Sequence, residues 1–211
     1  MSGLPDASGE VRRGGPAPAG PTDADLVARA LAGSERAFAD LVRRYERPIF
    51  SLIVRMVHDS TIAEDVAQET FLKAYRRLDT YDPTRKFSSW LFKIAHNATL
   101  DHLRRPSLDT LPLDAHGDDE ADFAAILADE KTESPEAGAG RYDLARALDR
   151  GLRGLRAEYS EVLLLRFRQG LSYQEIAEVT GQPLGTVKTN IHRARKELAA
   201  ALGGLGWHLT D

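Results

Sequence analysis

The feature that most constrains this sequence is the spacing of its apolar residues, which follows the 3.6-residue period of an α-helix in every patterned stretch. The most regular stretch is residues 62–78, whose expected inward face has a 3,1,3,1 spacing. That face comprises Ala63, Val66, Ala67, Thr70, Phe71, Ala74, Tyr75 and Leu78. No run alternates apolar and polar residues with the period of two that marks a half-buried β-strand. The sequence therefore predicts an all-α fold.

The helical patterns occupy two blocks, residues 22–106 and 141–202. The stretches around them are rich in Gly, Pro, Ala and Ser or in acidic residues, and they lack periodicity, which is typical of disordered or linker sequence. We expect a disordered tail over residues 1–21, two small helical domains joined by a flexible acidic linker over residues 107–140, and a short tail over residues 203–211.

Charge is divided along the chain in the same way. The 211 residues carry a net charge of −4, which taken alone argues mildly against a nucleic-acid partner. Residues 1–106 hold 16 Lys and Arg against 14 Asp and Glu, and residues 141–211 hold 11 against 8. The linker holds 10 acids and one lysine. Because both helical blocks are weakly basic, the distribution of charge supports nucleic-acid binding where the total does not.

The composition disfavours several classes of protein. The chain has no cysteine, so we expect no disulfide, thiolate nucleophile or zinc knuckle. Its six histidines are scattered and match no metal-ligand or nucleophile spacing. No apolar run approaches the roughly 20 residues that span a bilayer, and no signal peptide is visible. We expect a cytoplasmic protein that is not an enzyme, uses no metal or cofactor and does not insert into a membrane.

Local signals predict where several helices begin and end. Pro48 should kink or restart the helix expected around it. Thr61 and Glu64 have the spacing of a capping box, which would start the helix over residues 62–78. Ser88 is expected to cap the next helix, which should end near Pro106.

The clearest functional signal is a helix-turn-helix pattern near residues 172–202. Ser172 and Glu175 form a capping box, Gly181 suits the left-handed end of a short helix, and Pro183 suits the first turn of the next. The second helix should bury Val187, Ile191, Ala194 and Leu198. Its outer face should then carry Lys188, Thr189, His192, Arg193, Arg195 and Lys196.

An apolar docking face opposite a basic, hydrogen-bonding face is what a DNA recognition helix requires. Lys188 or Arg193 could pair with guanine edges, whereas Arg195 and Lys196 are better candidates for phosphate contacts. A basic helix can also be an ordinary solvated face of a bundle. The capping box, the glycine, the proline and the divided faces coincide here, which favours DNA binding.

The helix over residues 62–78 has an unusual outer face. A stripe of one leucine among polar and acidic residues runs along it: Asp65, Gln68, Glu69 and Leu72. Simple solvation would explain the acids, but the exposed leucine favours a surface that docks another protein. No basic or histidine partner with catalytic or ligand spacing accompanies these residues.

The segment over residues 84–105 is basic and contains interleaved aromatic residues, a combination that suits single-stranded or unstacked bases. The candidate DNA contacts are Arg85, Lys86, Phe87, Lys93, Asn97, Arg104 and Arg105. Phe87 and Trp90 are more often core residues than stacking platforms. Asn97 is unusual within a helix and is the best single candidate for a base contact.

Together these stretches resemble a known family. Residues 63–75 (AEDVAQETFLKAY) and 87–97 (FSSWLFKIAHN) look like region 2 of bacterial RNA polymerase sigma factors. Residues 171–177 (LSYQEIA), 185–189 (GTVKT) and 193–195 (RAR) look like region 4. The layout with no domain between them resembles the extracytoplasmic-function (ECF) subgroup of the sigma-70 family. The similarity covers about residues 23–106 and 141–202.

The resemblance implies a promoter-specificity subunit that binds core RNA polymerase and directs promoter-specific initiation. The docking stripe would contact the β′ clamp, and the 81–89 loop with Asn97, Arg104 and Arg105 would capture the −10 element as DNA melts. The recognition helix would read the −35 element, with its other face on the β flap. Many members of this subgroup are held by an anti-sigma factor, so we expect such a partner. The acidic linker would thread toward the RNA path, or serve as a solubilising tether.

A second hypothesis is a stand-alone helix-turn-helix regulator whose N-terminal bundle senses a signal or dimerises. The docking stripe and the basic 84–105 segment favour the sigma factor, because a sensor bundle requires neither. An enzyme with a helical active site is the third alternative. No metal-ligand or nucleophile arrangement in the sequence supports it.

Overall fold

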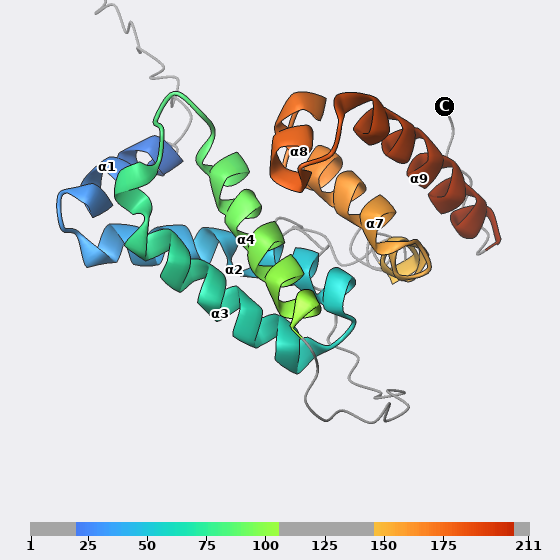
Figure 1. Ribbon diagram of the computed structural model, residues 1–211, viewed down its shortest axis with the longest axis horizontal. Coiled ribbons are helices and arrows are strands. Elements are labelled where there is room, and N and C mark those ends of the chain that lie inside the picture. The colour runs from blue at the N-terminus through green and yellow to red at the C-terminus, as the bar shows by residue number, and fades with distance from the viewer. Residues whose placement is uncertain (1–19, 106–145, 205–211) are drawn as a thin grey trace, which may run out of the picture.

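The computed structural model describes residues 20–105 and 146–204, and every regular element in these ranges is helical (Figure 1), which confirms the all-α prediction. The first range contains α1 (Asp23–Leu31), α2 (Glu35–Val57), α3 (Ser60–Arg76), the 3-10 turn η1 (Leu78–Thr80) and α4 (Phe87–Arg104). The second contains a helix through residues 146–153, α7 (Ala157–Leu163), the π-helical turn η2 (Leu164–Arg168), α8 (Tyr173–Thr180) and α9 (Leu184–Gly204). The predicted linker, residues 1–19 and residues 205–211 lie outside the described residues.

Residues 20–105 form the first lobe, which is built around α2. Helices α1, α3 and α4 pack against α2. Leu41, Ile49, Leu52 and Ile53 of α2 are almost fully buried, as is Phe92 of α4. Burying side chains of this size supplies most of the free energy that holds such a bundle together, at about 1.5–3 kcal/mol each.

Helix α2 does not restart at Pro48, so that part of the sequence prediction was wrong. Proline has no N–H, and the carbonyl four residues earlier loses its helical partner. Tyr45, Ile49 and Leu52 lie on one face of α2 on either side of this proline, and all three are buried. Their burial offsets the lost hydrogen bond and keeps the helix continuous over 23 residues.

Two predicted helix caps were also wrong. Helix α3 is capped by Asp59, whose carboxylate accepts the Ile62 N–H at 2.9 Å, rather than by the Thr61 capping box. His58 ends α2 in the left-handed conformation (φ 57°), and this sharp exit places Asp59 at the next N-terminus. Helix α4 begins at Phe87, without a side-chain cap at Lys86, and so one residue before the predicted cap Ser88.

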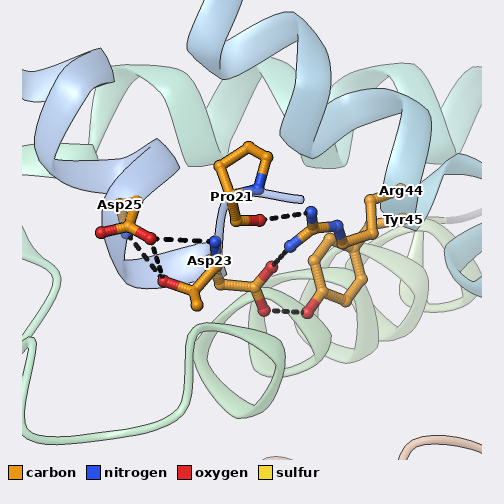
Figure 2. A network of polar contacts seen from close by, with 6 residues as sticks. Pro21, Asp23, Asp25, Arg44 and Tyr45 are labelled. Atoms are coloured by element: carbon orange, nitrogen blue, oxygen red, sulfur yellow. Dashed lines mark hydrogen bonds and ion pairs between the residues drawn. The ribbon is translucent and has the colours of Figure 1, made fainter. Parts of the chain in front are cut away.

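A polar network attaches α1 to α2 (Figure 2). The carboxylate of Asp23 accepts hydrogen bonds from Arg44 and from the Tyr45 hydroxyl, and Arg44 also donates to the Pro21 carbonyl at 2.8 Å. Burial raises the pKa of Tyr45, and the bond to Asp23 raises it further. The phenol therefore stays protonated and acts as a donor. Thr22 caps α1 through a reciprocal capping box with Asp25.

Residues 146–204 form the second lobe, in which α7 and α8 pack against α9. Its own apolar cluster is small and comprises Leu152, Leu155, Tyr159, Leu163, Leu164 and Ala194. Most other buried apolar residues of this lobe, among them Val162, Leu165 and Ile176, belong to a cluster that continues into the first lobe. Helix α4 lies beside α8 and α2 beside α7, so the two lobes are in direct contact (Figure 1).

Candidate nucleic-acid and protein interfaces

The helix-turn-helix prediction is confirmed at the level of local geometry. The Ser172 hydroxyl accepts the Glu175 N–H at 3.2 Å, and the Glu175 carboxylate accepts the Ser172 N–H at 2.6 Å. Gly181 ends α8 with φ 67°, a left-handed conformation that glycine adopts without steric cost. Two helices joined by this tight turn form the docking unit that presents a recognition helix.

Helix α9 divides its faces as the sequence predicts. Val187, Ile191 and Ala194 are buried and Leu198 is half-buried. The candidate −35 contacts are all exposed: Lys188, Thr189, His192, Arg193, Arg195 and Lys196. The hydroxyl of Thr189 donates to the Gly185 carbonyl at 2.9 Å within the helix, so its methyl group and oxygen lone pairs remain for a ligand.

The loop before α4 has a defined shape. Asp82 accepts hydrogen bonds from the N–H and the hydroxyl of Thr84, at 2.9 and 2.7 Å, and this Asx turn reverses the chain. The Tyr81 hydroxyl donates to the Arg85 carbonyl at 2.5 Å and closes the loop on itself. Arg85 and Lys86 consequently project from an ordered turn and not from a loose segment.

Phe87 does not lie on the basic surface with its neighbours. Its side chain is 3% exposed and packs edge-on against Tyr45 and Tyr81, with ring centroids 5.6 Å apart in both pairs. The ring of Trp90 packs against that of Phe87 at a tilted angle, and Trp90 is half-buried. The structure therefore assigns Phe87 to the core of the first lobe, and in this conformation the ring is not presented to DNA.

The other predicted −10 contacts lie on the surface. Lys93, Asn97, Arg104 and Arg105 are exposed along α4 and at its end. The guanidinium of Arg105 approaches Glu69 at 3.9 Å, at the edge of the neighbouring helix. Lys93, Asn97 and Arg104 have the spacing of one face of α4, and Arg105 directly follows the end of that helix.

Arg85 and Lys86 are engaged by the second lobe, which the sequence did not indicate. Arg85 Nη1 lies 2.6 Å from the Glu178 carboxylate, and Lys86 Nζ lies 3.2 Å from that of Glu175. Lys86 also donates to the Gly170 carbonyl at 3.3 Å. Burial alone would raise the pKa of Glu175, but hydrogen bonds from Ser172 and Lys86 outweigh burial, and its pKa is lowered.

The predicted stripe on α3 is present on the surface. Asp65 and Gln68 are exposed, Leu72 is 57% exposed, and Glu69 is half-buried. A hydrogen bond from Lys73 is the main reason that the pKa of Glu69 is lowered. An exposed leucine among hydrogen-bonding and acidic groups is a chemistry that suits a protein partner.

Sequence reasoning missed an apolar groove beside this stripe. Tyr75, predicted to face inward, is 53% exposed and contacts Phe38 of α2 edge-on at 4.9 Å. Two neighbouring hollows follow α2 and α3, and their apolar lining consists of Phe38, Ala39, Val42, Phe50, Ala67, Phe71 and Tyr75. The sequence contained a sign of this groove, because α2 has more apolar residues than a single buried helical face can hold.

Within residues 20–105 and 146–204, no group of three or more His, Asp or Glu side chains is arranged to hold a metal ion. No helix in the same ranges has the length and apolar character needed to cross a bilayer.

Comparison with known proteins identifies the family. The model of Sigma-70 region 2 matches residues 41–107, and that of Sigma-70 region 4 matches residues 145–198. The first match contains α3 and α4, and the second contains the helix-turn-helix. Each match thus falls on one lobe of the structure.

Relatives and solved structures agree with these matches. The chain is 39% identical to the RNA polymerase sigma-H factor of Pseudomonas aeruginosa, over 85% of this chain and 93% of that protein. It is 37% identical to the ECF RNA polymerase sigma factor SigW of Bacillus subtilis, over 82% and 92%. The structure of CnrH in complex with the cytosolic domain of CnrY superposes with a TM-score of 0.54 at 28% identity, covering 86% of this chain and 97% of that one. The chain belongs to the sigma-70 family of RNA polymerase sigma factors, in its ECF subgroup.

Proposed function

We propose that three surfaces of this sigma factor bind three different targets. The exposed face of α9 reads the −35 element as duplex DNA, through Lys188, Thr189, His192 and Arg193, with Arg195 and Lys196 on phosphates. Arg85, Lys86, Lys93, Asn97, Arg104 and Arg105 hold the −10 element as it melts. The α3 stripe of Asp65, Gln68, Glu69 and Leu72 docks on the clamp of core polymerase.

One observation carries this assignment. The first lobe places an exposed stripe of mixed acidic and apolar character on α3 next to a basic face on α4. A polymerase-docking surface directly beside a DNA surface allows one lobe to hold melted DNA against the enzyme. A stand-alone regulator would need only the helix-turn-helix, so this adjacency favours action as a polymerase subunit over the second hypothesis.

A protein partner that silences the factor would cover the same surfaces. CnrH was solved with the cytosolic domain of CnrY bound. We expect an anti-sigma factor for this chain, and the apolar groove along α2 and α3 is a surface that such a partner or the polymerase can use.

Transcription reconstitution with core RNA polymerase tests the proposal. The chain should support initiation from a subset of a genomic promoter library and should bind core enzyme. Asp65→Arg should weaken core binding by about tenfold or more, because it reverses a charge within the docking surface. Asp79→Arg is the matched control, since Asp79 is exposed on the same lobe but outside the stripe. Equal binding by both variants would contradict the docking assignment.

A further inference from the structure

The contact between the two lobes occupies part of the DNA surface. Arg85 and Lys86, proposed to hold the −10 element, are paired with Glu178 and Glu175 of α8 at 2.6 and 3.2 Å. Both cations keep more than half of their side-chain exposure, so the pairs lie at the rim of the contact. Carboxylates here occupy the position relative to the cations that phosphates of DNA would take.

Deeper in the same contact lie two buried polar pairs, each joining the lobes. Arg55 of α2 bonds to Asp149 at 2.8 Å, and their side chains are 6% and 7% exposed. His96 Nδ1 of α4 lies 2.6 Å from the Glu161 carboxylate of α7, with both side chains almost fully buried. Burial lowers the pKa of Arg55, and the bond to Asp149 works against that shift.

This polar character indicates a contact that can open. Removing charges from water costs several kcal/mol per ion, and pairing them roughly offsets that cost, so buried ion pairs add little net stability. When the lobes separate, the same four side chains regain water. Apolar burial still favours the closed form, because Val162, Leu165 and Ile176 of the second lobe pack into the cluster that contains Phe92 and Leu52 of the first. Apolar burial favours the closed form and hydration of the polar pairs favours the open form, and this opposition favours a reversible contact.

Geometry makes the closed form incompatible with a promoter. Elements centred on −35 and −10 are about 25 base pairs apart, or about 85 Å of duplex at 3.4 Å per base pair. A compact body of the size described here is about 40 Å across. The lobes in contact (Figure 1) cannot place α9 on one element and α4 on the other.

We propose that α8 and the 85–86 loop form an intramolecular latch, in which Glu175 and Glu178 compete with nucleic-acid phosphates for Lys86 and Arg85. The inference rests on the proposed role of these two cations. In the free protein the latch holds the −10 surface partly neutralised, while the recognition helix stays exposed. Separation of the lobes releases Arg85 and Lys86.

The test uses the full chain with Glu175→Gln and Glu178→Gln combined. Glutamine at 175 keeps the capping box, because its carbonyl oxygen can still accept the Ser172 N–H, so α8 should remain folded. Glu158→Gln combined with Glu197→Gln is the matched control, since it changes net charge equally at two exposed positions of the same lobe. The absence of cysteine allows a donor and an acceptor dye at Leu31→Cys and Ala200→Cys, both exposed.

Energy transfer between the dyes reports lobe separation, and binding of mixed-sequence single-stranded DNA reports the −10 surface. We expect the latch variant to show lower energy transfer than the control and to bind DNA about threefold to tenfold more tightly, as the loss of two exposed ion pairs would allow. Unchanged energy transfer would overturn the latch. Separation without tighter binding would overturn competition for DNA, as would equal tightening in the control.

Failure of the latch and failure of the proposed function give different results. A wild-type chain that supports promoter-dependent transcription, while the latch variant stays closed, would reject the latch alone. A latch variant that opens, in a chain that never supports initiation with core polymerase, would reject the proposed function and with it the competition that the latch serves.

Discussion

The two basic surfaces of this protein differ in how they are held. On α9 the cations lie on the outer face of a helix whose inner face is anchored by Val187, Ile191 and Ala194. On the first lobe, Arg85 and Lys86 lie on a short loop and are paired with acids from α8. If both surfaces bind DNA as we propose, the first is accessible as it stands, whereas Arg85 and Lys86 of the second must first exchange their partners.

The comparison shows that a basic stretch of sequence does not by itself define an accessible basic surface. A duplex reader requires a rigid helix in a fixed orientation, and local signals are sufficient to build one. A surface that captures melted DNA acts later, so part of it can be covered until the lobes move apart.

Phe87→Ala should have the largest effect, because it removes a buried ring from the base of the 81–89 loop. We expect the free energy of unfolding to fall by about 3–5 kcal/mol, the usual cost of such a cavity. Chemical denaturation measures this, and the exposed neighbour Lys86→Ala should leave stability nearly unchanged. Intact stability with reduced binding of single-stranded DNA would return Phe87 to the DNA surface.

Arg193→Ala tests whether the ready surface reads sequence. If Arg193 contacts a base, the variant should lose about 1–3 kcal/mol of binding at one position of the −35 element and accept other bases there. Lys196→Ala should instead weaken binding to all sequences alike and reduce the salt dependence. A binding assay over every single-base variant of a −35 duplex separates the two. Uniform weakening by Arg193→Ala would reassign that residue to phosphate.

Gly181→Ala tests the preformed turn of the recognition unit. The position has φ 67° and no atom near an added Cβ, so the cost is conformational and should be about 1 kcal/mol of unfolding free energy. Gly185→Ala lies in α9 with no close neighbour, and alanine should raise helix stability there. Opposite signs in thermal unfolding are expected. Equal effects would mean that the turn does not require the left-handed conformation.

Salt should have the smallest effect on the closed form. Raising ionic strength from about 0.05 to 0.5 M screens the exposed pairs of Arg85 and Lys86 but hardly affects the buried pair of Arg55 and Asp149. The open fraction of the dye-labelled chain should therefore rise by only about twofold to fivefold. Complete opening would show that the buried interface contributes little, and the contrast between rim and centre would be lost.

The recognition unit could be predicted almost fully from sequence. Its capping box, the glycine at the end of α8 and the buried spacing of α9 are all set within a few residues of chain. The failed predictions had two causes, tertiary burial in one case and a competing local cap in the other. Burial of Tyr45, Ile49 and Leu52 carried α2 across Pro48, and Asp59 took the cap predicted for Thr61.

The candidate site on the first lobe was predicted only in part. The stripe on α3 and the exposed face of α4 follow from helical spacing, which determines which side chains share a face. Spacing does not show what covers a face. Phe87 shares its segment with Lys86 but lies among Tyr45 and Tyr81, and Tyr75 left the predicted core to line a groove with Phe38.

Local features of the chain specify the all-α fold, the two helical blocks, the recognition helix and the family, because each depends on periodicity, capping or short motifs that operate within a few turns. Tertiary packing, by contrast, brings Arg55 to Asp149, His96 to Glu161, and the acids of α8 to the 85–86 loop. These partners are 65 to 94 residues apart. Pairing over such separations depends on how the lobes pack, which no local pattern encodes.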